Sequence, residues 1–90
     1  MELEKKKTYL PSFLKKCLDI TNGSLIRVIT NKEIDSVFNG LSKENICLLL
    51  EYFEQEGYIQ TKSKIPFIGK NIIKSFVITN KTLETINNNS

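Results

Sequence analysis

The chain has 90 residues, of which 40% are hydrophobic and 26% charged, and its formal net charge is +3. This composition is typical of one soluble globular domain, here spanning 1–90, and excludes a disordered chain. Because the sequence contains no histidine, it lacks the commonest general base and metal ligand, and we expect neither an enzyme nor a cofactor or metal site. No apolar run reaches the length of a membrane span, and the charged N-terminus does not look like a signal peptide, so we expect a cytoplasmic protein.

Charge is distributed unevenly along the chain. Residues 28–56 carry two basic and six acidic side chains, whereas residues 57–83 carry five lysines and no acid. Residues 1–27 are basic again, with six basic and three acidic side chains. This segregation predicts one electropositive face, although lysines that merely keep a hairpin soluble would give the same pattern.

The two cysteines, Cys17 and Cys47, are far apart in sequence and form no CxxC motif. Each lies among apolar residues in a helical pattern. We therefore expect two reduced, partly buried thiols, with a disulfide or a redox role as the alternatives.

The first predicted element is a helix over residues 8–20, with a basic arm over residues 1–7 before it. Thr8 is a suitable N-cap, and Pro11 would then fall in the first turn, where a missing N–H does no harm. The apolar residues recur with helical spacing and define one face: Leu10, Phe13, Leu14, Cys17 and Leu18.

A short strand is predicted next, over residues 24–29, because the sequence SLIRVI is rich in branched apolar residues. Thr30 and Glu33 then have the spacing of a capping box, in which each side chain satisfies a backbone N–H at a helix start. The short helix that follows is expected to bury Ile34, Val37 and Phe38 and to end at Gly40.

The most regular helical pattern covers residues 43–56, after Ser42 as N-cap, and ends at Gly57. Its apolar positions lie on one face: Ile46, Leu49, Leu50 and Phe53. The residues that face away from the core are Glu44, Cys47, Leu48, Glu51 and Gln55. We expect this helix to pack its apolar face on the core and to expose the rest.

Two strands are predicted after this helix, over residues 58–62 and 72–79. The lysine-rich segment between them would form the end of a hairpin, with Pro66 and Gly69 at its tip because both residues suit turns.

A last short helix is expected to begin at Thr79 as N-cap. Its inward residues would be Leu83 and Ile86. Residues 87–90 form a polar tail that we expect to fray.

Three segments resemble the winged helix-turn-helix family. The closest is LSKENICLLLEYFEQEGYI, residues 41–59, and the capped helix ITNKEIDSVF precedes it. FVITNKTLETI, residues 76–86, is similar to a closing strand-to-helix segment of bacterial members, although Thr82 stands where a glycine is common. The resemblance implies an α+β winged helix: a three-helix core, a small antiparallel sheet whose hairpin is the wing, and a short C-terminal helix.

For function, the resemblance implies binding of double-stranded DNA, with the N-terminal half of helix 43–56 in the major groove and the wing on the backbone. The expected role is a transcriptional repressor or a plasmid or phage DNA-organising factor, acting as a homodimer by occupying its site. We expect no membrane and no small-molecule substrate. The candidate DNA-binding residues are Ser42, Lys43, Glu44, Asn45, Cys47, Leu48, Lys62, Lys64, Lys70 and Lys74.

The outer face of helix 43–56 departs from a typical DNA reader, because Leu48 and Glu51 occupy positions where many relatives are basic. A protein–protein interaction module that does not bind DNA is therefore the alternative, using this acidic face or the apolar wing tip. An ordinary solvated helix face would also fit. At the tip, Phe67 and Ile68 could fold back on the core, meet a second subunit or enter a minor groove, and we favour a protein contact.

Overall fold

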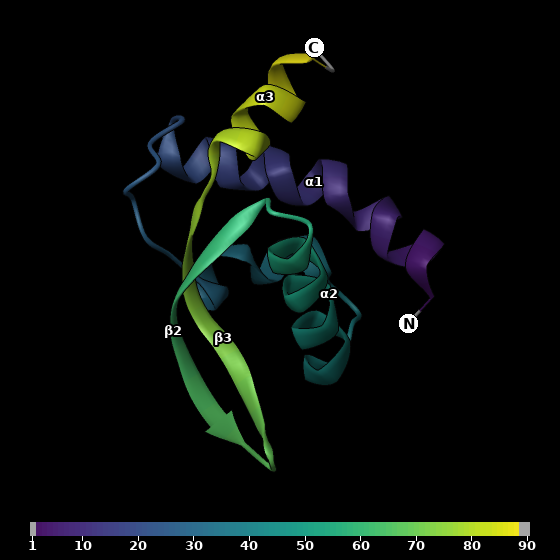
Figure 1. Cartoon of the computed structure of the whole chain (residues 1–90). Helices are drawn as coiled ribbons and strands as arrows, with labels where there is room; N and C mark the ends of the chain where they lie inside the picture. The colour runs from purple at the N-terminus through teal and green to yellow at the C-terminus, as the bar shows by residue number, and fades with distance from the viewer. Residues whose placement is uncertain (1, 89–90) are drawn as a thin grey trace.

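Four helices pack against a small three-stranded antiparallel sheet in the computed structural model, which describes residues 2–88 except for the side chain of Phe67 (Figure 1). The α+β class is therefore confirmed. The order is α1 (Leu3–Thr21), β1 (Ile29–Thr30), the 3₁₀ helix η1 (Asn31–Phe38), α2 (Lys43–Gln55), β2 (Ile59–Phe67), β3 (Lys70–Ile78) and α3 (Asn80–Asn88). Within residues 2–88, no helix is both long and apolar enough to cross a membrane.

The core is built around four phenylalanines that come from four different elements. Phe13 of α1 lies at the centre, with its ring centroid 4.4 Å from that of Phe53 on α2. The rings of Phe38 and Phe76 lie 6.0 and 5.9 Å from it. All four side chains are at most 1% exposed, so Phe13 joins α1, η1, α2 and β3.

Helix α1 begins at Leu3, earlier than predicted, and takes in most of the expected basic arm. The residues of the arm are mainly Leu, Glu and Lys, which are good helix formers, and the Lys6 ammonium lies 5.6 Å from the centre of the Tyr52 ring. The prediction that Thr8 caps the helix was wrong, since its hydroxyl donates to the Lys5 carbonyl within the helix. Pro11 lies inside the helix on an exposed side, where water can hydrate the carbonyl that loses its partner.

The strand predicted over residues 24–29 is much shorter, because only Ile29 and Thr30 pair with β3. The chain leaves α1 through Asn22 and Gly23, both with positive φ, and then bends at residues 25 and 26. Ile29 is fully buried and fixes the end of the segment, whereas Ile26 is 87% exposed. Branched side chains therefore predicted the strand correctly only where one of them reaches the core.

The predicted capping box forms at the start of η1. Glu33 Oε1 accepts the Thr30 N–H at 3.0 Å, and both oxygens of Glu33 accept from Arg27, at 2.8 and 2.9 Å. Arg27 also donates to the Val28 carbonyl at 2.6 Å. Arg27 thus satisfies a backbone carbonyl just before β1, and Glu33 satisfies a backbone N–H within β1.

This arrangement makes the free energy of unfolding depend on pH in the acidic range. The hydrogen bonds from Arg27 and from the Thr30 N–H lower the pKa of Glu33 from 4.5 to about 2. Because this folded-state pKa is depressed, the stabilisation is complete above pH 4.5 and is lost as pH falls toward 2. Urea unfolding at a series of pH values should show that loss, and Glu33→Gln should reduce it. If Glu33→Gln lost as much stability at low pH as the wild type does, Glu33 would not be the source of this pH dependence.

The β2–β3 hairpin is longer than predicted and projects past the helices (Figure 1). Its turn consists of Ile68 and Gly69, with φ of 42° and 75°. Gly69 therefore lies at the tip as expected, but Pro66 does not, because it pairs with Asn71 inside the ladder. Proline is tolerated there because β2 is an edge strand, with β3 between it and β1.

Ile68 is an unfavourable residue for this turn. A β-branched residue with positive φ is strained, at a cost of about 1–2 kcal/mol, whereas asparagine accepts that conformation. Because Ile68 is 87% exposed, Ile68→Asn removes little packing. We expect the substitution to raise the free energy of unfolding by about 1 kcal/mol in denaturant titrations. Ile68→Val keeps the branched side chain and should give no gain; equal effects of the two variants would contradict the strain.

Helix α3 follows β3 directly, and Leu83 and Ile86 pack against the core as predicted. Thr79 precedes the helix, but its hydroxyl donates to the Gly57 carbonyl at 2.6 Å instead of capping α3. The hydroxyl of the fully buried Thr82 donates to the Tyr58 carbonyl, also at 2.6 Å. These bonds fasten α3 to the start of β2. Of the predicted polar tail, residues 87 and 88 belong to α3, and residues 89 and 90 lie outside the described part.

Candidate nucleic-acid interface

The first turn of α2 lies at the protein surface. Ser42 caps the helix as predicted, and its hydroxyl accepts the Asn45 N–H at 3.2 Å. Leu49, Leu50 and Phe53 anchor the other side of the helix in the core. Ser42, Lys43 and Glu44 are exposed, whereas Asn45 is half-buried, so its amide has less freedom to reach a ligand.

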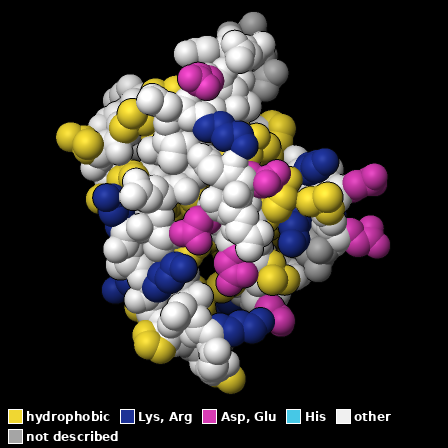
Figure 2. All heavy atoms as spheres, viewed as in Figure 1, with side chains coloured by type: hydrophobic (Ala, Val, Ile, Leu, Met, Phe, Trp, Pro, Cys, Tyr) yellow, Lys and Arg dark blue, Asp and Glu magenta, His cyan; other side chains and the backbone are white. Residues whose placement is uncertain are grey.

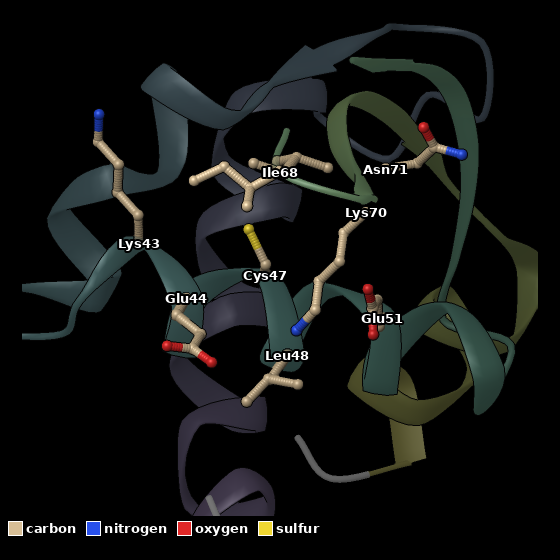
Figure 3. Close-up of a pocket in the computed structure, with 9 residues that line it drawn as sticks. Lys43, Glu44, Cys47, Leu48, Glu51, Ile68, Lys70 and Asn71 are labelled. Atoms are coloured by element: carbon tan, nitrogen blue, oxygen red, sulfur yellow. The ribbon is translucent and has the colours of Figure 1, made fainter. Parts of the chain in front are cut away.

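A groove of about 240 Å³ lies between this half of α2 and the end of the hairpin (Figure 3). It brings together five of the ten predicted DNA-binding residues, and Ile68 of the predicted partner contact also lines it. The groove is lined by Lys43, Glu44, Cys47, Leu48 and Glu51 of α2 and by Ile68, Lys70, Asn71 and Ile72 of the hairpin. The remaining candidates, Ser42, Asn45, Lys62, Lys64 and Lys74, do not line it.

Lys70 extends from the hairpin back across the groove toward α2 (Figure 3). Burial raises the pKa of the nearby Cys47 thiol above its usual value, and the negative charges of Glu51 and Glu44 act in the same direction. The positive charge of Lys70 opposes them but does not reverse the shift. The thiol is therefore protonated and weakly nucleophilic near neutral pH. Both Cys17 and Cys47 are free thiols, as predicted.

Lys64 is the one hairpin lysine that forms an ion pair within the described residues. Its Nζ lies 3.8 Å from Glu54 Oε1, and the Thr61 hydroxyl donates to the other oxygen of Glu54. Glu54 therefore joins α2 to the hairpin. Such a partly exposed pair contributes little stability, but it removes part of the charge that Lys64 would offer to a phosphate.

Lys62 and Lys74 lie at irregularities of the ladder. The pairing between β2 and β3 shifts around Ser63, which leaves Lys62 and Lys74 without a partner in the register. Both side chains are exposed. In Figure 2, basic and acidic side chains alternate around the hollow beside the hairpin, so the face is mixed in charge and not uniformly basic.

A second, larger hollow of about 520 Å³ lies on the η1 side of the hairpin. Its lining includes the apolar residues Phe38, Leu50 and Ile73. Lys43, Cys47 and Ile72 line both hollows. Both hollows are therefore lined by residues of α2 and of the outer half of the hairpin, and the buried residues of β3 begin at Ile73.

Sequence reasoning missed three residues of the groove as candidate contacts: Glu51, Asn71 and Ile72. Glu51 was expected on the outer face of the helix, but the sequence did not predict that it would share a groove with Lys70. Asn71 and Ile72 could have been found from a correct hairpin length. The turn consists of Ile68 and Gly69, so β3 begins at Lys70 and Asn71 is its second residue, near the hairpin tip.

The molecule thus belongs to the α+β class, with a small antiparallel sheet and a helix-lined groove beside its hairpin. Comparisons with protein-family models, with curated proteins and with solved structures found no match to this chain.

Proposed function

We propose that this protein is a winged-helix protein that binds double-stranded DNA through α2 and the β2–β3 hairpin. The order of elements supports this arrangement: α1, β1 and η1 precede α2, and the hairpin follows it. η1 and α2 would form the helix-turn-helix, joined by residues 39–42. In that arrangement α2 is the helix that enters the major groove.

The observation that carries the proposal is the shared groove of Lys43 and Lys70. The two ammonium groups come from α2 and from the hairpin, so one duplex that approaches this face meets both elements. Lys62 and Lys74 extend the basic surface along the hairpin, and within the described residues neither forms an ion pair. Lysines at such positions neutralise phosphates and release counterions, which gives affinity without sequence preference.

Sequence preference would come from the first turns of α2. Ser42 and Lys43 suit phosphate contact, and Asn45 has the amide that pairs with adenine when it is free to turn outward. Glu44 and Glu51 oppose a close approach of phosphates, so we expect α2 to enter the groove by its N-terminal end and not along its whole length. Occupancy of a site is then sufficient for repression or for DNA organisation.

The test is equilibrium binding of a labelled random duplex, followed by fluorescence anisotropy at ~50 mM salt. We expect micromolar or tighter binding, as non-specific contacts of this kind give. Lys43→Ala should weaken binding to every duplex. Lys5, near the start of α1, is also exposed, and Lys5→Ala should not weaken binding. Absence of binding at micromolar protein would overturn the proposal.

One observation favours a second candidate, an interaction module that binds a protein and not DNA. The lining of the groove includes the apolar side chains of Cys47, Leu48 and Ile72 together with the carboxylates of Glu44 and Glu51. A basic segment with an apolar anchor would fit such a groove. This candidate predicts no duplex binding at ~50 mM salt, so the same titration separates the two.

A further inference from the structure

The pairing between β2 and β3 is irregular at one place, which divides the hairpin into an inner and an outer half. Residues up to Thr61 pair in one register, Ser63 pairs with Ser75 out of step, and the first register resumes at Lys64. At the irregularity the hydroxyl oxygens of Ser63 and Ser75 lie 2.6 Å apart. Residues 62–66 of β2 are all exposed, so little of this half of the strand is packed in the core.

Glu54 of α2 contacts β2 on both sides of this irregularity. The Thr61 hydroxyl donates to one oxygen of its carboxylate, and the Lys64 ammonium lies 3.8 Å from the other oxygen. In a regular strand, residues three apart point to opposite faces of the sheet. Because the register shifts lie between Thr61 and Lys64, both side chains can reach the same carboxylate. We call Glu54, Thr61 and Lys64 the Glu54 bridge.

The Glu54 bridge distinguishes Lys64 from the other lysines of the hairpin. Lys62, Lys70 and Lys74 are exposed, and within the described residues none of them forms an ion pair. The phosphate of a duplex and the Glu54 carboxylate are both anionic acceptors, so they compete for the Lys64 ammonium. Glu54 also repels a phosphate that approaches Lys64, because both groups are negatively charged. Lys64 is therefore the hairpin lysine with the least charge to offer to DNA.

We propose that Glu54 is a positioning residue of the DNA-binding site, which holds Lys64 back from the duplex and thereby limits affinity. This inference rests on the proposed function and concerns the regulation of the same site. The side chains of Lys64 and Glu54 are 44% and 33% exposed, so water and salt screen their attraction. An ion pair of this kind changes an equilibrium constant by no more than about fivefold. Glu54 therefore adjusts the affinity for DNA and does not abolish it.

Glu54→Gln tests the proposal, because it removes the charge and keeps the shape of the side chain. The amide oxygen can still accept the Thr61 hydroxyl, so the hairpin keeps its attachment to α2 while Lys64 is released. In the duplex titration at ~50 mM salt, we expect Glu54→Gln to bind about fivefold more tightly than wild type. The slope of log affinity against log salt should become more negative by roughly 0.9, because one more lysine contacts a phosphate. Circular dichroism should show an unchanged fold.

Glu84→Gln is the control matched for charge. Glu84 is exposed on α3, which lies at the other end of the molecule from the hairpin tip (Figure 1), and its replacement changes the net charge equally. This variant should bind the duplex with nearly the affinity and the salt dependence of wild type. Equal gains in affinity from Glu54→Gln and Glu84→Gln would mean that only the overall charge matters, and would overturn the proposal.

Lys64→Ala completes a double-mutant cycle that isolates the pair. In wild type, where Glu54 holds Lys64, Lys64→Ala should change the affinity by less than about twofold, whereas in the Glu54→Gln background it should remove the gain of about fivefold. Equal effects of Lys64→Ala in the two backgrounds would overturn the role of Glu54 and leave DNA binding by the protein intact. Absence of duplex binding by both wild type and Glu54→Gln would instead overturn the proposed function and this inference with it.

Discussion

Replacing Phe13 with alanine is expected to lower the free energy of unfolding by about 3–5 kcal/mol, the largest effect of any single substitution that we predict. Its ring is fully buried and contacts phenylalanines of three other elements, with the Phe53 ring at 4.4 Å. Because small domains are stable by only about 5–15 kcal/mol, the variant should be partly unfolded at moderate temperature. Urea titration followed by circular dichroism measures the change.

The control for Phe13→Ala is Leu3→Ala on the same helix. Leu3 is 53% exposed, so its replacement should change the free energy of unfolding by less than about 0.5 kcal/mol. Phe13→Leu, which keeps most of the apolar volume, should fall between the two. A loss of less than about 1 kcal/mol in Phe13→Ala would show that the four rings do not form the centre of the core.

The second large effect concerns the hairpin lysines. Simultaneous replacement of Lys62, Lys70 and Lys74 with alanine should weaken binding to all duplexes about equally, by about a thousandfold at ~50 mM salt. The reason is that each phosphate contact contributes about 0.9 to the slope of log affinity against log salt, and three contacts are removed. Lys64 is left in place because Glu54 already pairs with it.

The matched control removes the same charge from another surface. Lys5, Lys7 and Lys15 are exposed on α1, and their replacement changes the net charge equally. If the hairpin contacts DNA, this control should retain most of the affinity. Equal losses in the two triple variants would mean that only the overall charge matters and would remove the hairpin from the mechanism.

Much of the fold could be predicted from local signals. Helix α2 is capped by Ser42 as predicted, and the chain turns after η1 and α2 at Gly40 and Gly57, which both have positive φ. The apolar face of α2 packs as its spacing indicated. The true extent of the strand predicted over residues 24–29 could not be derived from the sequence, because the composition of Leu25 and Ile26 is typical of a strand although both residues lie outside the sheet. Propensity gives the preference of a segment, and only packing decides whether a partner strand is present.

The hairpin shows the same limit at the candidate site. Pro66 was expected at the tip because prolines favour turns, yet an edge strand accepts it, and the turn moved to Ile68 and Gly69. That change of length places Lys70 on the groove and Lys64 beside Glu54. Lysine content along the sequence was visible, but which lysines face an acid depends on the register between the hairpin and α2.

The salt dependence of duplex binding tests the central claim most directly. If Lys43, Lys62, Lys70 and Lys74 contact phosphates together, the slope of log affinity against log salt should be about −3.6. Affinity would then fall roughly 150-fold between 50 and 200 mM salt. A slope near zero, or no binding of micromolar protein at ~50 mM salt, would contradict a DNA-binding face formed by α2 and the hairpin.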